Sequence, residues 1–196
     1  MNSDRFDHDA STPHSVRGGR PASNHLVVVD MQRVFADPSS GWATPGFAAI
    51  VPTVARLVET CTPDVTFTRF VAPARPAGAW RDYYAQWSFA LQPPDAPLWD
   101  VVPELGPTGP TVDAPTFSKW GPELAARVGT TTLVLAGVST DCCVLSTAVA
   151  AADAGVPVQV VADACAGMDD ASHRKALDVL ALYAPLIEVV TSAELR

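Results

Sequence analysis

Residues 132–144 read TLVLAGVSTDCCV and join an apolar strand to a pair of cysteines. The run Leu133 to Ala136 is typical of a buried strand, and Gly137 and a polar turn follow it. An alanine-rich helical segment, Leu145 to Ala154, comes after the cysteines and ends at Gly155. A cysteine between a strand and a helix lies at the positive end of the helix dipole, where its pKa falls and backbone N–H groups point outward. The stretch therefore predicts a thiolate nucleophile with oxyanion donors beside it.

The two cysteines leave alternatives open at this level. Free cysteine is often buried as a small hydrophobic residue, so both thiols could simply pack beside the helix. Successive helical positions point about 100° apart, so Cys142 and Cys143 cannot have the same role. The residues alone do not decide which of the two faces a cleft.

Apolar strands alternate with helical segments along the rest of the chain. This alternation predicts an α/β protein, a single-domain three-layer α/β/α Rossmann-like fold with a mainly parallel sheet of about six strands. Ligands bind such sheets at the carboxyl ends of strands, near a switch in strand order. The predicted strands are His25–Asp30, Asp64–Arg69, Thr111–Asp113, Thr132–Ala136, Val158–Ala162 and Leu186–Val190, and the predicted helices are Phe47–Cys61, Pro122–Val128, Leu145–Ala154 and His173–Tyr183.

Composition limits the possible partners. The chain has 196 residues, a net charge of −8 and an isoelectric point near 4.8, which argues against nucleic-acid binding. No apolar run approaches the roughly 20 residues that span a bilayer, and no secretory signal is visible, so we expect a cytoplasmic protein without a membrane partner. Four cysteines show no disulfide or zinc spacing. Residues 1–24 are predicted to be a flexible arm, and residues 25–196 the folded domain.

A longer string, residues 137–165, carries a family resemblance. It reads GVSTDCCVLSTAVAAADAGVPVQVVADAC and resembles the signature of the isochorismatase-like cysteine hydrolases, which include nicotinamidases and N-carbamoyl amidohydrolases. In that pattern Thr140 and Asp141 lead, Cys142 takes a free position, and Cys143 is the nucleophile. The resemblance also implies a cis peptide bond at Val138–Ser139.

Two further segments match the same pattern. The first predicted strand runs into Asp30, with Gln32 and Phe35 beyond it, and Lys119 lies in the segment FSKW. The resemblance implies a catalytic set of Asp30, Lys119 and Cys143. Asp30 would move the proton, and Lys119 would lower the pKa of the thiol. Residues expected to contact substrate are Gln32, Phe35, Trp87, Trp120 and Ser139, and for Gln32 an ordinary helix-start role is the alternative.

The implied activity is hydrolysis of a C–N bond, in an amide, carbamoyl or lactam compound, through a thioester. Residues 66–71 read TFTRFV and lack the histidine ligand of nicotinamidases, so we expect no metal and no cofactor. Two alternatives are a vinyl-ether hydrolase of the isochorismatase type, in which the cysteine is replaced, and a thiol redox or binding protein on the same fold. A nucleotide-binding domain is excluded because the turn DMQRVF has no glycine-rich phosphate loop.

A Pro- and Trp-rich excursion, residues 71–109, holds a dense group of aromatic residues. Either these residues pack the segment onto its own domain, or some line the substrate pocket and some bury a subunit interface. Because relatives by resemblance form dimers or tetramers, we expect a homodimer or homotetramer that acts on a small amide-type molecule. The aromatic residues are Trp80, Tyr83, Tyr84, Trp87, Phe89 and Trp99.

Overall fold

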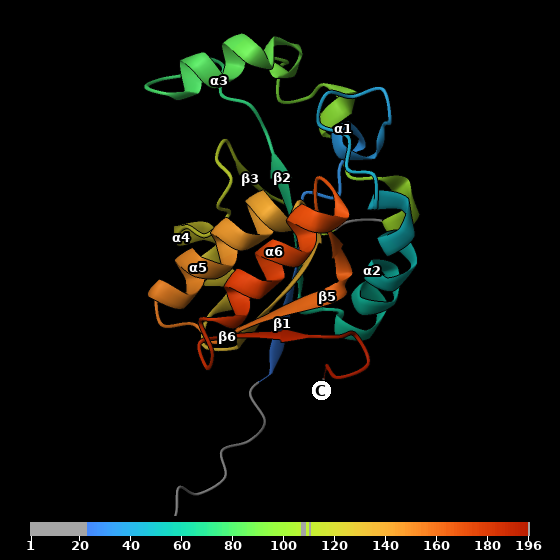
Figure 1. Ribbon diagram of the computed structural model, residues 1–196, viewed down its shortest axis with the longest axis vertical. Coiled ribbons are helices and arrows are strands. Elements are labelled where there is room, and N and C mark those ends of the chain that lie inside the picture. Colours follow the sequence, from blue (N-terminus) through green and yellow to red (C-terminus); the bar gives the residue numbers. More distant parts are fainter. Residues whose placement is uncertain (1–22, 107–108, 110, 196) are drawn as a thin grey trace, which may run out of the picture.

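Six parallel strands form one sheet in the order β3-β2-β1-β4-β5-β6 (Figure 1). The computed structural model describes residues 23–106, 109 and 111–195. The strands are β1 Asn24–Val29, β2 Val65–Phe70, β3 Thr111–Ala114, β4 Thr132–Val138, β5 Val158–Ala166 and β6 Ile187–Val190. Each strand begins within one residue of its predicted start, and the predicted α/β fold with a six-stranded parallel sheet is confirmed.

Helices cover both faces of this sheet (Figure 1). Helix α2 packs against β1, β4 and β5 on one face, and α4, α5 and α6 lie together on the other. The α-helices are α1 Arg33–Ala36, α2 Phe47–Cys61, α3 Trp80–Gln86, α4 Pro122–Val128, α5 Leu145–Asp153 and α6 Asp170–Ala181. Short helical turns are η1 Ser88–Ala90, η2 Pro97–Trp99, η3 Pro103–Leu105 and the π-helical turn η4 Thr140–Val144.

Helix α6 begins three residues earlier than predicted, and its cap explains the difference. Asp169 is the N-cap residue, and its carboxylate accepts a hydrogen bond from the backbone amide of Ser172 at 2.7 Å. An aspartate cap satisfies one of the free amides of the first turn. His173 therefore lies inside the helix, where its Nδ1 is 2.8 Å from the hydroxyl of Thr140.

Strands β1 and β4 approach each other closely at the point where the strand order switches. Gly137 pairs with Val29 and has a φ of +116°, and a Cβ built on Gly137 would lie 2.2 Å from the carbonyl oxygen of Val29. Only glycine fits this contact. The close approach brings the ends of β1 and β4 together, and the turns that follow them form one site.

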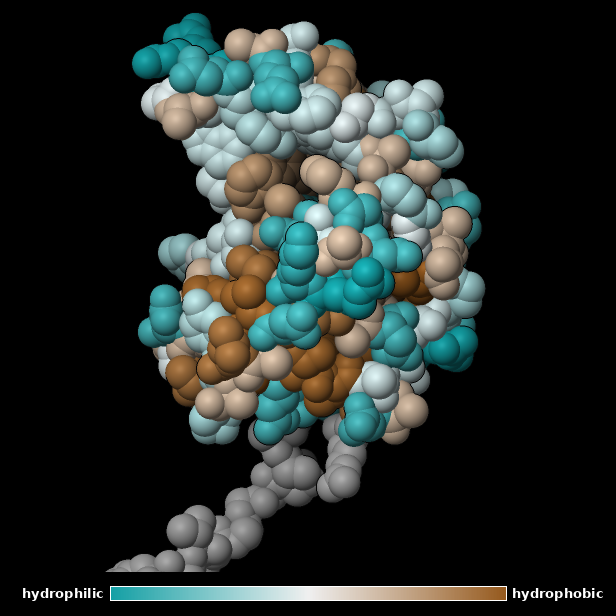
Figure 2. Space-filling model, viewed as in Figure 1, coloured by the Kyte–Doolittle hydropathy of each residue, from teal (hydrophilic) through white to brown (hydrophobic). Residues whose placement is uncertain are grey.

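The aromatic excursion packs against its own domain. Trp99 and Tyr84 are fully buried, and Trp42, which precedes α2, contacts rings from both sides of the excursion. Helix α3 stands away from the sheet, and the surface is hollowed between it and the body of the molecule (Figures 1 and 2). The segment was predicted as an irregular excursion, because α3 has seven residues and no repeated apolar face to reveal it.

The predicted arm, residues 1–24, lies outside the described residues except for its last two. Of these, Asn24 already belongs to β1. In the part of the chain that the structure describes, no helix is long and apolar enough to cross a membrane.

Candidate active site

Asp30 follows β1 at the switch in strand order, and its side chain has no solvent exposure. Its φ of +50° is in the left-handed region, which aspartate tolerates better than most residues. Thr68 on β2 donates a hydrogen bond from its hydroxyl to Oδ1 of Asp30 at 2.8 Å and accepts one from the backbone amide of Asp30 at 3.3 Å. The neighbouring strand thus holds the carboxylate in one orientation.

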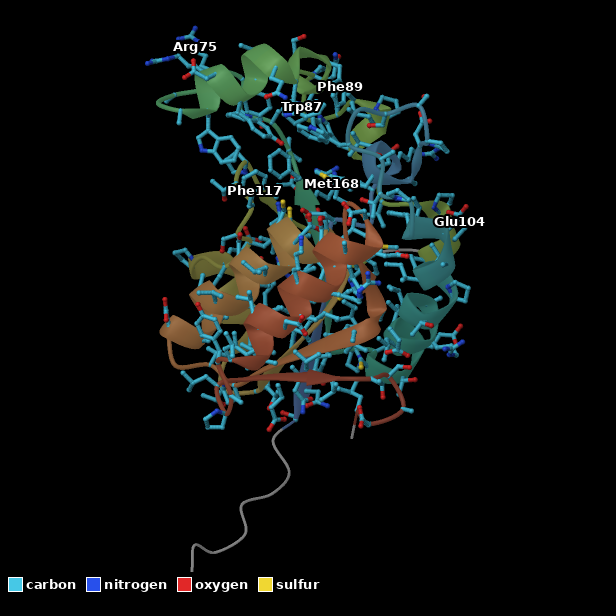
Figure 3. The ribbon with its side chains drawn as sticks, viewed as in Figure 1. Arg75, Trp87, Phe89, Glu104, Phe117 and Met168 are labelled. Carbon is cyan, nitrogen blue, oxygen red and sulfur yellow. The ribbon has the colours of Figure 1, made fainter. Side chains whose placement is uncertain are left out.

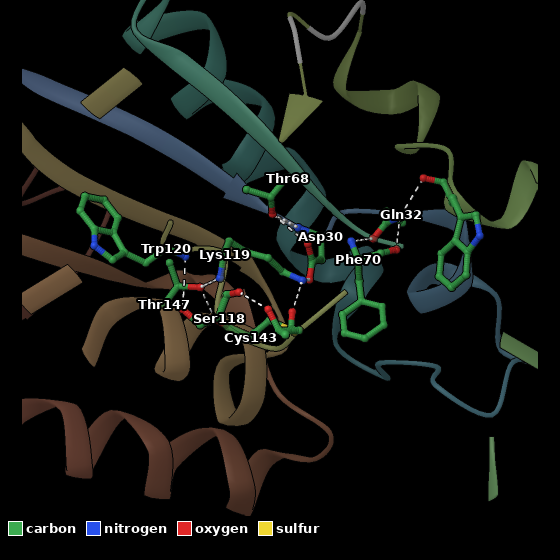
Figure 4. Close-up of polar contacts among 11 residues, drawn as sticks. Asp30, Gln32, Thr68, Phe70, Ser118, Lys119, Trp120, Cys143 and Thr147 are labelled. Carbon is green, nitrogen blue, oxygen red and sulfur yellow. Dashed lines mark hydrogen bonds and ion pairs between the residues drawn. The ribbon is translucent and has the colours of Figure 1, made fainter. Parts of the chain in front are cut away.

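Lys119 reaches the same point from the segment after β3. Its Nζ lies 2.9 Å from Oδ2 of Asp30, and neither side chain is exposed (Figure 4). The ammonium group also donates to the carbonyl oxygen of Thr116 at 2.8 Å and lies 4.5 Å from the ring centre of Phe70. Beyond its ion pair with Lys119, Oδ2 of Asp30 accepts no hydrogen bond from the described residues.

Cys143 lies in η4 beside this ion pair and is 3% exposed. Burial raises the pKa of its thiol well above the ordinary value; Lys119 opposes this rise, and the Asp30 carboxylate adds to it as a charge and a hydrogen-bond partner. The pKa therefore moves opposite to the predicted direction. A dry pocket penalises the thiolate more than one cation, itself paired with a carboxylate, can stabilise it.

One residue that the sequence analysis did not single out connects two of these three. The hydroxyl of Thr147 on α5 donates to the carbonyl oxygen of Cys143 at 2.7 Å and accepts a hydrogen bond from the backbone amide of Lys119 at 2.9 Å. Thr147 is fully buried and lies one turn after the cysteine. Its place within the family-like string was the available signal.

The turn before Cys143 is shaped by Ser139. The peptide bond between Val138 and Ser139 is cis, as the resemblance implied. The carbonyl oxygen of Ser139 accepts hydrogen bonds from the amides of Cys142 and Val144, both at 3.1 Å. Its hydroxyl donates to Asp141 at 2.5 Å, and the same oxygen of Asp141 accepts the amide of Met168 at 3.0 Å. Asp141 thereby joins the cysteine turn to the loop after β5.

A cavity of 380 Å³ opens above Cys143. Trp87 comes to it from the segment after α3, and Phe117 and Met168 come from loops of the body below (Figure 3). Of the residues predicted to contact substrate, the cavity wall includes Phe35, Trp87 and Ser139. The complete lining is Phe35, Gly41, Trp42, Ala43, Thr44, Phe70, Tyr83, Trp87, Phe117, Ser139, Cys142, Cys143 and Met168.

Gln32 and Trp120, also predicted to contact substrate, lie elsewhere. The side chain of Gln32 is fully buried, and its amide bonds with the backbone of Phe70 in both directions and with the carbonyl oxygen of Trp99. It fastens the aromatic excursion to β2, because every strong hydrogen-bonding group of the side chain is used there. The indole of Trp120 lies on the far side of Lys119 from Cys143 (Figure 4), and it is not part of the cavity lining.

A larger open groove of 640 Å³ lies beside α1, η2 and η3 and is lined by residues such as Arg33, Phe89 and Glu104. It contains none of the three residues Asp30, Lys119 and Cys143, whereas the smaller cavity is lined by Cys143. No group of three or more His, Cys, Asp or Glu side chains among the described residues is arranged to hold a metal ion. Metal independence stays a prediction.

The fold is similar to that of several known proteins. The family model of the isochorismatase domain matches residues 24–194. No curated protein matches the sequence at a significant level. Among solved structures, a cysteine hydrolase from Pseudomonas syringae pv. phaseolicola 1448A is 25% identical with a TM-score of 0.78, and the match covers 94% of this chain and 95% of that one.

Two further solved structures show the same fold at lower identity. N-carbamoylsarcosine amidase from Thermoplasma acidophilum is 22% identical with a TM-score of 0.71, over 89% of this chain and 99% of that one. The pyrazinamidase of Pyrococcus horikoshii, solved in complex with zinc, is 21% identical with a TM-score of 0.68, over 86% and 99%.

Proposed function

The chain belongs to the isochorismatase-like hydrolase family, and we propose that it is a metal-independent, cysteine-dependent hydrolase of a C–N bond in a small amide, carbamoyl or lactam compound. One observation carries the proposal. The buried thiol of Cys143 lies at the base of a cavity and next to a carboxylate that is paired with an ammonium group. A nucleophile, a proton acceptor and a balancing cation are the groups that acyl transfer from an amine needs.

In the first half of the proposed reaction the sulfur of Cys143 attacks the substrate carbonyl carbon. Because the pKa of the thiol is raised, the proton leaves during the attack and passes to Oδ2 of Asp30. The tetrahedral intermediate then expels the amine, which takes that proton, and a thioester remains on Cys143. Lys119 keeps its charge throughout and stabilises the Asp30 carboxylate before and after the transfer.

In the second half a water molecule attacks the thioester carbon. Asp30 accepts one proton from this water and returns it to the departing sulfur, which restores the thiol and the starting charges. The amides of Cys142 and Val144 already bond to Ser139, so we assign the backbone amide of Cys143 as a donor to the oxyanion.

The decisive experiment uses the two adjacent cysteines as a matched pair. A screen of small amides, ureas and lactams with wild-type protein should identify a substrate, and mass spectrometry of the quenched reaction should find its acyl group on Cys143. Cys143→Ser should abolish turnover, whereas Cys142→Ser should retain most of it. The reason is that the charges of Asp30 and Lys119 act on the thiol of Cys143 and not on that of Cys142. Equal loss of turnover in both variants at equal folded content would contradict the assignment.

The assembly is a separate proposal. We propose a homodimer or homotetramer, on the resemblance to family members that assemble in this way. Light scattering after size-exclusion chromatography at micromolar concentration tests it, and a monomer there would refute it.

A further inference from the structure

The cavity above Cys143 is lined mainly by aromatic rings. Six rings reach it from separate parts of the chain, together with the thioether of Met168: Phe35, Trp42, Phe70, Tyr83, Trp87 and Phe117. Its volume of 380 Å³ lies near the lower end of the roughly 300–1,000 Å³ of small-molecule pockets. These dimensions suit a compact molecule with one apolar ring.

No cationic side chain among the described residues lines this cavity. Three arginines are close in sequence to residues that line the cavity, but none of them is part of the lining. Arg69 makes hydrogen bonds of 2.8 and 2.6 Å to the carboxylate of Asp113, Arg75 points away from the cavity (Figure 3), and Arg81 is exposed. Lys119 is already paired with Asp30. A substrate carboxylate would lose its hydration here and gain no charged partner, which is strongly unfavourable.

A cationic substrate is disfavoured for a different reason. Aromatic rings can attract cations, but the ammonium group of Lys119 already lies 4.5 Å from the ring centre of Phe70, which is one of the lining rings. The carboxylate of Asp30 is paired with Lys119, and no carboxylate of the described residues is part of the cavity lining, so a cation would lose its hydration there without gaining a charged partner. The remaining class is a neutral molecule.

Resting on the proposed function, we infer that the substrate is a small neutral amide that carries an apolar, preferably aromatic, ring, and that the cavity rejects analogues in which the ring bears a carboxylate. The amide carbonyl lies at Cys143, and the ring lies among Trp42, Trp87 and Phe117. The same absence of cations favours departure of the carboxylate that hydrolysis of such an amide produces.

Binding to the Cys143→Ser variant tests this inference without turnover. The probes are benzamide, 4-carboxybenzamide and 4-(trimethylammonio)benzamide, which share a ring and an amide and differ in charge. Isothermal titration calorimetry should give an affinity for benzamide at least 100-fold above that for either charged probe. Equal affinity for 4-carboxybenzamide, tighter binding of the cationic probe, or no binding of benzamide would each overturn the inference.

A charge introduced at the cavity mouth provides the matched test. Met168 is 63% exposed and lines the cavity, so a polar residue there loses little burial. Both variants are made in the Cys143→Ser background, and the measured quantity is the affinity for 4-carboxybenzamide divided by the affinity for benzamide. This ratio should be about tenfold higher in Met168→Lys than in Met168→Gln, because glutamine has a similar length and no charge. An unchanged ratio would contradict the inference.

The outcomes separate this inference from the proposed function. Selective binding of benzamide by the Cys143→Ser variant would support the inference that the pocket takes a neutral substrate. If the wild-type protein cleaves no amide and forms no thioester, the proposed hydrolase function is refuted, but the binding result still stands. Cleavage of 4-carboxybenzamide as fast as benzamide would refute the neutral pocket and leave the hydrolase in place.

Discussion

The buried ion pair between Asp30 and Lys119 allows a quantitative test of how the site is held together. The two charged atoms are 2.9 Å apart, and both side chains are completely buried. At an effective dielectric constant of about 20, their Coulomb attraction is about 6 kcal/mol. Burial of the two charges opposes most of this gain, but removal of one partner leaves the other charge stranded and costs about 3–5 kcal/mol of unfolding free energy.

The perturbation is a double-mutant cycle of Asp30→Asn and Lys119→Met. Each single substitution should destabilise the protein by about 3–5 kcal/mol, whereas the double variant, with neither charge, should lose less than the sum by at least about 2 kcal/mol. The matched control is the exposed pair of Glu123 and Arg127, whose charged atoms are also 2.9 Å apart. Glu123→Gln and Arg127→Met should show a coupling below about 1 kcal/mol, because water screens this pair.

The assay is urea-induced unfolding followed by tryptophan fluorescence, combined with alkylation of Cys143 by iodoacetamide as a function of pH. Lys119→Met should raise the pKa of Cys143 further, and Asp30→Asn should lower it, since Lys119 opposes and Asp30 supports the present rise. Additivity of the two substitutions within about 0.5 kcal/mol would refute the coupled pair. A shift of the alkylation profile in the reverse direction would refute the electrostatic reading of the site.

Three further outcomes are expected. Gly137→Ala should destabilise the protein by more than about 4 kcal/mol in urea unfolding, because its Cβ would overlap the carbonyl oxygen of Val29. Gly129→Ala, at a φ of +60° with open space around it, should cost only the backbone strain of about 1–3 kcal/mol, and similar losses in the two variants would contradict the argument. Because the pKa of Cys143 is raised, the folded state keeps a proton above about pH 8.5, the pKa of a cysteine in the unfolded chain, which has lost that proton. The free energy of unfolding should therefore fall as pH rises, and it should fall less in Cys143→Ala. Parallel curves for the two proteins would count against the raised pKa. Activity found in the amide screen should survive exhaustive chelation, and elemental analysis should find no stoichiometric metal; loss of turnover that zinc or iron restores would overturn the metal-free chemistry.

The layout of the fold could be predicted from local patterns. Apolar runs bounded by turns predicted the start of every strand within one residue, and the face of apolar residues from Phe47 to Cys61 predicted the bounds of α2. These features depend on neighbours in sequence and on the period of the side chains, which the sequence displays directly. The strand-to-helix pattern around Cys143 likewise predicted the position of the cysteine turn, and the resemblance of residues 137–165 to the family signature implied its cis peptide bond.

Tertiary structure decided how the side chains are used. Gln32 follows the first strand as the family pattern requires, yet its amide is consumed by the backbone of Phe70 and Trp99, which lie 38 and 67 residues away in sequence. The pKa of Cys143 rises although it lies before a helix, because the surrounding segments exclude water. The aromatic cavity is assembled from loops that follow different strands.

The difference between what the sequence predicts and what only the tertiary structure decides has one physical cause. Secondary structure follows from short-range sterics and from the alternation of apolar residues, and both are properties of a local segment. Burial, ion pairing and the shape of a cavity are sums over segments far apart in the chain, and no local pattern contains them. The sequence by itself therefore determined the sheet and the place of the cysteine turn, while packing decided the raised pKa of Cys143 and the aromatic lining of the cavity above it.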